Sequence, residues 1–249
     1  MSIDRICKRL VTGLLLAGLA SGALNAQEIS GDRSPIDGAE LIVHPISHAT
    51  FAMGWNGKTI FVDPVGGGGR FAGLPAPDLI LITDIHGDHL DVETLQAVAG
   101  ADTRIVAPAE VAAKLPDTLA GNTTVLANGA TGALLGFSIE AVPMYNLTED
   151  RLKYHVRGRG NGYVLELAGV RVYVSGDTED IPEIRALENI DVAFVCFNLP
   201  YTMTEEQAAS AVREFAPDIV YPYHFRGSDV DEFARLVGDA SEVRVLDWY

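Results

Sequence analysis

Thr83-Asp84-Ile85-His86-Gly87-Asp88-His89 is the stretch of the sequence from which the fold can be inferred. It carries two imidazoles and two carboxylates, and it directly follows the apolar run Leu79-Ile80-Leu81-Ile82. A run this short and this rich in isoleucine and leucine predicts a buried strand rather than a helix. The polar side chains would then lie in a loop at the carboxyl end of a strand, where open α/β sheets place their ligands. Imidazole and carboxylate groups suit zinc, iron or manganese, so these residues predict a metal site.

Polar residues also follow other predicted strands, namely Asp63, His155, Asp177 and His224, of which His155 lies in a longer polar link. Each alone has an ordinary explanation, because a strand-end aspartate is usually a turn former, and residues 83–89 alone could be an acidic surface turn. Together these residues would converge on one edge of a sheet, and such a joint pattern arises by chance much more rarely than any one of them alone. A carboxylate such as Asp177 could then bridge two cations, and the water between them would be a nucleophile at neutral pH.

Residues 1–26 predict a signal peptide. A basic start is followed by an apolar core over residues 10–20, which is too short to span a bilayer, and by Leu24-Asn25-Ala26, which presents small residues where signal peptidase cleaves. A retained membrane anchor is the alternative. We therefore expect a periplasmic or secreted protein that makes no membrane contact after cleavage.

The charge and the cysteines restrict the classes of function. The formal net charge of −16 describes a surface that repels nucleic acid and anionic membranes unless a local basic patch intervenes. We therefore expect no nucleic-acid partner. Cys196 is the only cysteine after residue 26, so no intramolecular disulfide is expected, and its apolar surroundings favour a buried thiol. A catalytic cysteine is the alternative, although no His-Cys signature surrounds Cys196.

The rest of the sequence predicts one layered domain over residues 39–249, preceded by a loosely ordered lead-in over residues 27–38, which contain Pro35. The glycine run at 65–70 lacks the Gly-Lys-Ser/Thr ending of a phosphate-binding loop and predicts a mobile loop that could overhang a site. Strands cluster first and then alternate with helices, which predicts a layered α/β protein with two sheets packed face to face and helices outside. The expected strands are 40–53, 58–62, 79–82, 122–127, 132–142, 162–167, 170–175, 191–197, 218–224 and 243–246, and Asn128-Gly129 is expected to join 122–127 to 132–142. The expected helices are 91–99, 108–115 and 181–187, followed by two helices with predicted caps. The first of these begins with a capping box at Thr204-Glu-Glu-Gln207 and runs to Phe215, and the second runs from the cap Ser228 to Val237.

With these residues in place, the chain resembles the metallo-β-lactamase superfamily of metal-dependent hydrolases, and within it the lactonase-like branch. The family signature H-x-H-x-D-H is specific when a later aspartate and histidine accompany it. The resemblance implies an α/β fold, the αββα sandwich of two mixed sheets, with a dinuclear and usually zinc site at one edge of the sheets. The segments that match are His48-Ala-Thr-Phe, Val62-Asp63-Pro64, residues 83–89, Ser175-Gly-Asp-Thr178 and Tyr221-Pro-Tyr-His224.

The resemblance also implies a role for each residue of the site. Asp63 matches a buried aspartate that braces the metal loop through hydrogen bonds. Asp177 matches the carboxylate that bridges the two ions. Of the remaining ligands, those of metal 1 would be Asp84, His86 and His155, and those of metal 2 would be Asp88, His89 and His224. The two divalent ions are expected to be zinc, with manganese or iron as alternatives.

Two departures from the family pattern concern metal 1. Asp84 stands where the signature has its first histidine, and this harder, charged ligand could favour manganese or iron or weaken the site. The strand that should deliver the third histidine ends in Asn146, so we expect the ligand to be His155 in the following loop. Asn146 would then support the site or face the substrate, and His48 would be a supporting residue.

The sequence thus predicts a hydrolase in which a metal-activated water attacks a small ester, lactone or phosphoester. Asp88 or Asp177 would act in catalysis by orienting the water and passing its proton to the leaving group. A non-catalytic or mononuclear relative, with metal 1 altered by Asp84, is the alternative. The substrate would be a small molecule, and an anionic one if the single basic stretch forms an anion-binding rim rather than a solvated loop; this stretch contains Arg151, Lys153, Arg157 and Arg159.

Overall fold

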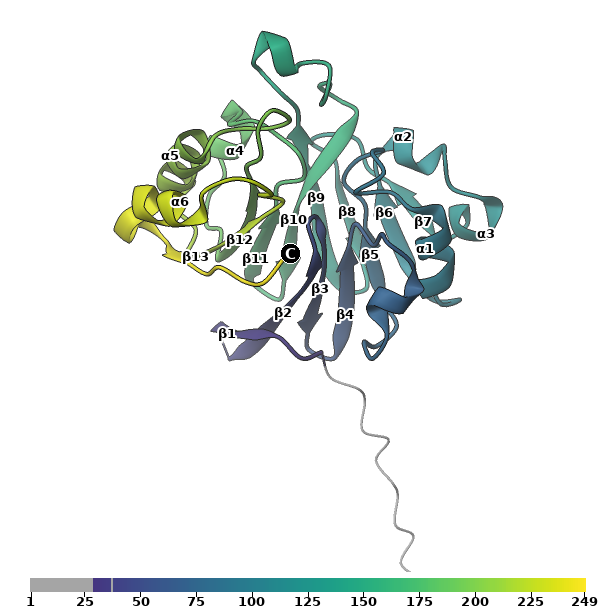
Figure 1. Ribbon diagram of the computed structural model, residues 1–249. Coiled ribbons are helices and arrows are strands. Elements are labelled where there is room, and N and C mark those ends of the chain that lie inside the picture. Colours follow the sequence, from purple (N-terminus) through teal and green to yellow (C-terminus); the bar gives the residue numbers. More distant parts are fainter. Residues whose placement is uncertain (1–28, 37) are drawn as a thin grey trace, which may run out of the picture.

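The computed structural model describes residues 29–36 and 38–249, and the predicted signal peptide lies outside the described residues. Two sheets pack face to face, and helices cover the outer face of each, so the predicted αββα sandwich is confirmed (Figure 1). Among the described residues, no helix combines the length and the apolar character that crossing a membrane requires.

The first sheet has the order β1-β2-β3-β4-β5-β6-β7. Its neighbours are antiparallel from β1 to β4 and parallel from β4 to β7, so the sheet is mixed. The parallel part places the carboxyl ends of β4 and β5 side by side. The strands are β1 (Asp32–Ile36), β2 (Ala39–Ser47), β3 (Thr50–Trp55), β4 (Lys58–Val62), β5 (Leu79–Leu81), β6 (Arg104–Ala107) and β7 (Thr123–Val125).

The second sheet repeats this plan in the order β14-β13-β12-β11-β10-β9-β8. It is antiparallel from β8 to β11 and parallel from β11 to β14, so the carboxyl ends of β11, β12 and β13 lie at one edge. The strands are β8 (Thr131–Leu134), β9 (Phe137–Met144), β10 (Gly160–Leu167), β11 (Val170–Val174), β12 (Val192–Cys196), β13 (Ile219–Tyr223) and β14 (Glu242–Val243).

The helices divide between the two outer faces. Helices α1 (Val92–Val98), α2 (Ala109–Ala112) and α3 (Asp117–Ala120) lie with the first sheet, and α4 (Pro182–Arg185), α5 (Glu205–Phe215) and α6 (Val230–Val237) lie with the second (Figure 1). The capping box at the start of α5 is confirmed, but α6 is capped by Asp229 rather than Ser228, because the Asp229 carboxylate accepts from the Glu232 amide. Short 3-10 turns occur at η1 (Gly68–Phe71), η2 (Glu149–Arg151) and η3 (Gly238–Ala240).

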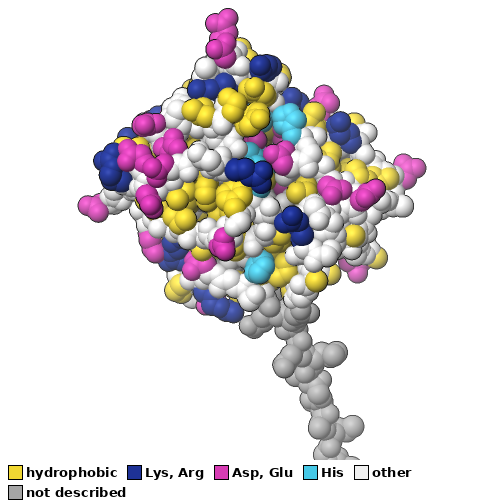
Figure 2. Space-filling view, in the orientation of Figure 1, with side chains coloured by type: hydrophobic (Ala, Val, Ile, Leu, Met, Phe, Trp, Pro, Cys, Tyr) yellow, Lys and Arg dark blue, Asp and Glu magenta, His cyan; other side chains and the backbone are white. Residues whose placement is uncertain are grey.

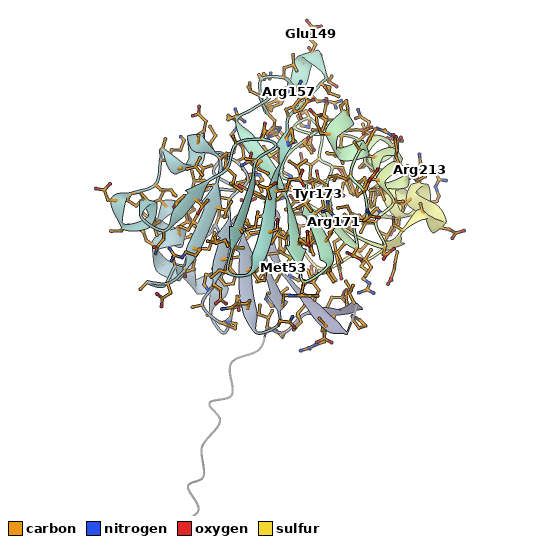
Figure 3. The ribbon with its side chains drawn as sticks, turned by 180° about the vertical axis from the view of Figure 1, so that it is seen from behind. Met53, Glu149, Arg157, Arg171, Tyr173 and Arg213 are labelled. Atoms are coloured by element: carbon orange, nitrogen blue, oxygen red, sulfur yellow. The ribbon has the colours of Figure 1, made fainter. Side chains whose placement is uncertain are left out.

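The main core lies between the two sheets and is centred on aromatic rings. Phe51 of the first sheet stacks on Phe194 of the second at a centroid distance of 4.3 Å, and Phe194 stacks on Tyr221 at 5.1 Å. All three side chains are buried, as are Met53 and Tyr173, which Figure 3 labels on strands of the two sheets. Removal of this much apolar surface from water is the main force holding the sheets together.

The predicted lead-in over residues 27–38 is wrong in part, because Asp32–Ile36 forms the edge strand β1. The Tyr221 hydroxyl donates to the Asp32 carboxylate at 2.6 Å, and Arg244 Nη1 donates to Ser34 Oγ at 2.7 Å. Pro35 is tolerated because an edge strand leaves one side of its backbone without a sheet partner. Tertiary contacts that a local sequence pattern does not contain therefore fix this strand.

Three further segments differ from the sequence prediction. The run 40–53 is two strands, separated by a turn at His48, whose φ is +54°. The run 132–142 is the hairpin β8–β9, and Asn128-Gly129 connects the two sheets rather than a hairpin. The glycine run forms η1 against α1, where the Gly67 amide donates to Thr94 Oγ1 at 2.7 Å, and it does not line the cavity described below.

Candidate metal centre

A cavity of ≈ 510 Å³ opens where the strand ends of the two sheets meet. The loops after β5, β11 and β13 and the long β9–β10 loop contribute to its wall. Figure 2 shows histidine side chains reaching the surface beside acidic and basic ones in the upper middle of the visible face. The predicted site residues that line the cavity are His86, Asp88, His155, Asp177 and His224.

Asp63 fixes the loop 83–89 from behind. Its buried carboxylate follows β4 and accepts from the Thr83 amide at 2.7 Å, from Thr83 Oγ1 at 2.6 Å and from His89 Nδ1 at 2.8 Å. The hydrogen bond to Nδ1 fixes the ring orientation and directs His89 Nε2 toward the cavity. The bracing contacts expected of Asp63 are therefore present.

The first ligand group combines residues of both sheets. His89 Nε2 lies 3.3 Å from Asp177 Oδ2, and His224 Nε2 lies 3.3 Å from Asp177 Oδ1 and 3.4 Å from Asp88 Oδ2. Asp88 Oδ1 is 3.9 Å from His89 Nε2. The sequence assigned these four side chains to metal 2 and to the bridge. Of them, His89, Asp177 and His224 form a group that could hold a metal ion, and Asp88 lies beside this group.

The second ligand group lies on the other side of Asp177. Asp84, His86 and His155 offer atoms that all lie within 4.8 Å of one another. His155 Nε2 is 3.2 Å from Asp177 Oδ2, the same oxygen that faces His89, and 3.9 Å from Asp84 Oδ2. The carboxylate of Asp177 therefore lies between the two groups.

The donor set fits divalent cations. His89 Nε2 and Asp177 Oδ1 are buried without a hydrogen-bond partner, although each lies close to other ligand atoms. Such unpaired buried atoms cost roughly 1–3 kcal/mol each, a cost that a bound ion would remove. Imidazole nitrogen and carboxylate oxygen in these numbers suit zinc, iron or manganese.

The two cavity carboxylates are ionised at neutral pH. Burial alone would raise the pKa of Asp177, but the neighbouring His224 and His89 lower it well below the ordinary value. Burial also opposes ionisation of Asp88, but the hydrogen bonds from His224 and His48 lower the pKa of its carboxyl. Both groups are therefore ready to accept a cation without losing a proton first.

Asn146 supports the loop that carries His155. Its side-chain amide donates to the carbonyls of Arg151 at 3.0 Å and Tyr201 at 2.7 Å, and its backbone amide donates to the His155 carbonyl at 2.9 Å. His155 Nδ1 lies 3.2 Å from the Tyr201 carbonyl, which leaves Nε2 to face the cavity. The geometry thus places His155 in the ligand group and Asn146 behind it.

His48, expected to be a supporting residue near the site, lies in direct contact with it. Its ring stacks on His224 at 3.7 Å between centroids, and its Nε2 is 3.5 Å from Asp88 Oδ2, so His48, Asp88 and His224 form a third group that could hold an ion. His48 Nδ1 is 2.8 Å from the hydroxyl of Tyr249. Sequence reasoning missed Tyr249, because no motif surrounds this residue and its contact with His48 is purely tertiary.

Three arginines of the basic stretch are paired with carboxylates. Arg151 pairs with Glu179 at 2.6 Å, Arg157 pairs with Glu183 at 2.8 Å, and Arg159 faces Asp84. Figure 3 shows Arg157 and Glu149 on the projecting β9–β10 loop. Carboxylates of the same chain thus neutralise these arginines. Arg226, an exposed side chain that sequence reasoning did not single out, lines the cavity.

The fold and the site define a class, the metal-dependent hydrolases of metallo-β-lactamase fold. The family model of the beta-lactamase superfamily domain matches residues 43–224, and the chain belongs to this superfamily.

Similar proteins carry the same description. A UPF0173 metal-dependent hydrolase of Thermococcus onnurineus (strain NA1) is 34% identical over 214 residues, which cover 81% of this chain and 94% of the relative. A relative in Lysinibacillus sphaericus (strain C3-41) is 31% identical over 214 residues, which cover 80% and 93%. A crystal structure from Parabacteroides distasonis ATCC 8503, described as a candidate metal-dependent hydrolase, is 41% identical with a TM-score of 0.81 over 89% of this chain and all of that one. Igni18, a metallo hydrolase of Ignicoccus hospitalis KIN4/I, has 21% identity and a TM-score of 0.68 over 83% and 94%, and shows the fold alone.

Replacing Asp63 tests whether its hydrogen bonds to the loop 83–89 support metal binding. In Asp63→Asn the charge that holds Thr83 and His89 is lost, so we expect the affinity for zinc to fall by about 10- to 100-fold. Competition with a chromophoric chelator measures this affinity. Asp78→Asn, which removes an ion pair with Lys58 away from the cavity, is the matched control and should bind zinc as the unchanged chain does. Equal zinc affinity in both variants would contradict the role of Asp63.

Cys196 is not a nucleophile in this structure. The thiol is fully buried, and burial raises its pKa to about 12. We therefore expect iodoacetamide to leave Cys196 unmodified in the folded protein at pH 8 and to alkylate it in guanidinium chloride, because only the thiolate reacts. Mass spectrometry of the peptide that contains Cys196 measures the modification. Rapid labelling of the folded protein would show that the site is open.

Proposed function

We propose that this metal-dependent hydrolase uses two divalent ions to hydrolyse a small ester, lactone or phosphoester, and that both ions are zinc. The observation that carries the proposal is the position of Asp177, whose carboxylate separates two ligand groups at 3.2–3.3 Å inside one cavity. The proposed ligands of metal 1 are Asp84, His86 and His155, those of metal 2 are Asp88, His89 and His224, and Asp177 belongs to both.

The bound ions would supply a nucleophile from water at neutral pH and polarise the carbonyl or phosphoryl oxygen of the substrate. The Asp88 side chain is 45% exposed and faces the cavity, whereas that of Asp177 is 4% exposed and surrounded by histidines. Asp88 can therefore orient the attacking water and pass its proton to the leaving group. Asp177 would fix the position of the two ligand groups relative to each other, and its buried side chain has little access to a substrate.

The residues that line the cavity favour a small substrate with an apolar part and an anionic part. Leu199 and Tyr201 are partly exposed side chains in its wall, and the ring of Tyr154 packs edge-on against Tyr201 at 5.1 Å. Arg226 lies in the same wall, with its guanidinium 5.4 Å from the centre of the Tyr249 ring. A carboxylate or phosphate on the substrate would find its counterion there.

Elemental analysis and a substrate panel test this function together. Protein purified without added metal should carry two ions per chain and hydrolyse at least one of a set of lactones, esters and phosphodiesters. Asp88→Ala and His89→Ala should abolish turnover, because each removes a ligand, and Asp102→Ala, an exposed change before β6, should not. Fewer than one ion per chain with no turnover across the panel would favour the non-catalytic alternative.

The role of Arg226 is tested by pairs of anionic and neutral substrates that differ in one charged group. We expect Arg226→Met to lower kcat/KM for the anionic member by about tenfold through a higher KM, since a charge-assisted hydrogen bond contributes roughly 1.5–3 kcal/mol. The neutral member should be unaffected. Arg213→Met on α5, labelled in Figure 3, is the control for loss of an exposed arginine. An equal loss for both substrates would exclude Arg226 as the anion site.

A further inference from the structure

An arginine stands inside the cluster that the metal 1 residues form. Arg159 Nε lies 3.3 Å from Asp84 Oδ1, and Arg159 Nη2 lies 3.3 Å from Asp84 Oδ2 and 3.4 Å from His86 Nε2. Asp84 has no exposed side-chain surface, and the Arg159 side chain is 17% exposed. A buried carboxylate is strongly destabilising without a partner, and Arg159 supplies a permanent positive charge.

Both oxygens of Asp84 face the guanidinium of Arg159, and Oδ2 also faces the ligand group. Oδ2 points into the ligand group, 2.6 Å from His86 Nδ1 and 3.9 Å from His155 Nε2. Oδ1 points to Arg159 Nε. Both distances to the guanidinium exceed the 2.7–2.9 Å of a tight charged pair, so the contact is loose enough to leave Oδ2 available.

The backbone fixes Arg159 at this position. The next residue but one, Asn161, donates its amide to the Thr83 carbonyl at 2.9 Å, which ties the start of β10 to the residue before Asp84. A side chain at Gly160 could not fit, because its Cβ would lie 2.9 Å from the same carbonyl and 2.2 Å from Met144 Cε. Arg159 Nη2 also donates to the Tyr154 carbonyl. Arg159, the residue directly before β10, is therefore held beside Asp84 by the contact between β10 and Thr83.

The role of Arg159 follows from the net charge of the ligand group. The family signature places a neutral imidazole where this chain has Asp84, so the substitution alone adds one negative charge to the site. The fixed positive charge of Arg159 cancels that addition. We propose that Asp84 and Arg159 act as one unit in place of the missing histidine, with Asp84 Oδ2 as a ligand of metal 1 and Arg159 as the positioning residue that orients and neutralises it. The inference rests on the two-ion function proposed above.

A double-mutant cycle on metal binding tests the unit. Equilibrium dialysis against zinc with elemental analysis counts the ions and gives two affinities per chain. In Arg159→Met we expect the weaker of the two affinities to fall by about tenfold or more, because Asp84 loses its orientation and counterion. Asp84→His should also bind the second ion poorly, since Arg159 is then unpaired beside a cation. Asp84→His/Arg159→Met, which recreates a neutral site, should recover the second ion.

Controls separate this effect from loss of folding. Arg157→Met removes a neighbouring arginine of the same loop that pairs with Glu183 outside the ligand group, and it should bind two ions as the unchanged chain does. Arg159→Lys keeps the charge and should retain more of the second affinity than Arg159→Met. Urea unfolding of each zinc-free variant identifies any that are destabilised, and the visible spectrum of the cobalt(II) form reports the geometry of each occupied site.

Two results would overturn the inference. One is a second zinc that binds Arg159→Met as tightly as, or tighter than, the unchanged chain, because the guanidinium would then compete with the ion. The other is a double variant that is no better than the single ones. An unchanged chain that binds one ion and still hydrolyses a substrate refutes the paired unit and leaves the hydrolase. One that binds two ions and hydrolyses nothing refutes the proposed reaction and leaves the unit.

Discussion

The site depends on one buried carboxylate, that of Asp63. Three donors of the loop 83–89 converge on it, and with each donor in place the charge is compensated inside the protein. Because β4 and β5 are parallel neighbours, the residue after β4 lies next to the loop after β5. The same hydrogen bond that satisfies Asp63 holds His89 in one orientation. Charge compensation and ligand geometry are therefore a single requirement, and a change in one disturbs the other.

The site also requires both sheets. His89 comes from the first sheet, while His155, Asp177 and His224 come from the second, so no ligand group is complete before the sheets pack. The aromatic stack of Phe51 on Phe194 lies in the core between the sheets. Hydrophobic burial thus sets the distance between the ligands, and the polar contacts refine it. This order explains why a largely apolar core can support a site made almost entirely of charged and imidazole groups.

Local patterns in the sequence were sufficient for the parts of the fold that local physics determines. The short apolar run before residues 83–89 identified a buried strand, and the Thr204 capping box identified the start of α5. The errors fall where pairing is decided by distant residues. Strand β1 is held by Tyr221 and Arg244, and β7 and β8 join different sheets although few residues separate them. The periodicity of apolar residues predicts which residues of a strand are buried, but it does not predict which strand or sheet they pack against.

The same limit applies inside the site. The signature residues could be located by their spacing, but Arg159, Arg226 and Tyr249 could be placed only by the structure. Tyr249 shows the reason most clearly. Its hydroxyl is 2.8 Å from His48 Nδ1 and accepts from the Phe225 amide at 2.9 Å, so it connects the turn after β2 with the loop after β13. Through His48, whose Nε2 faces Asp88, this phenol constrains the most exposed carboxylate of the cavity, although 161 positions separate Tyr249 from Asp88 in the sequence.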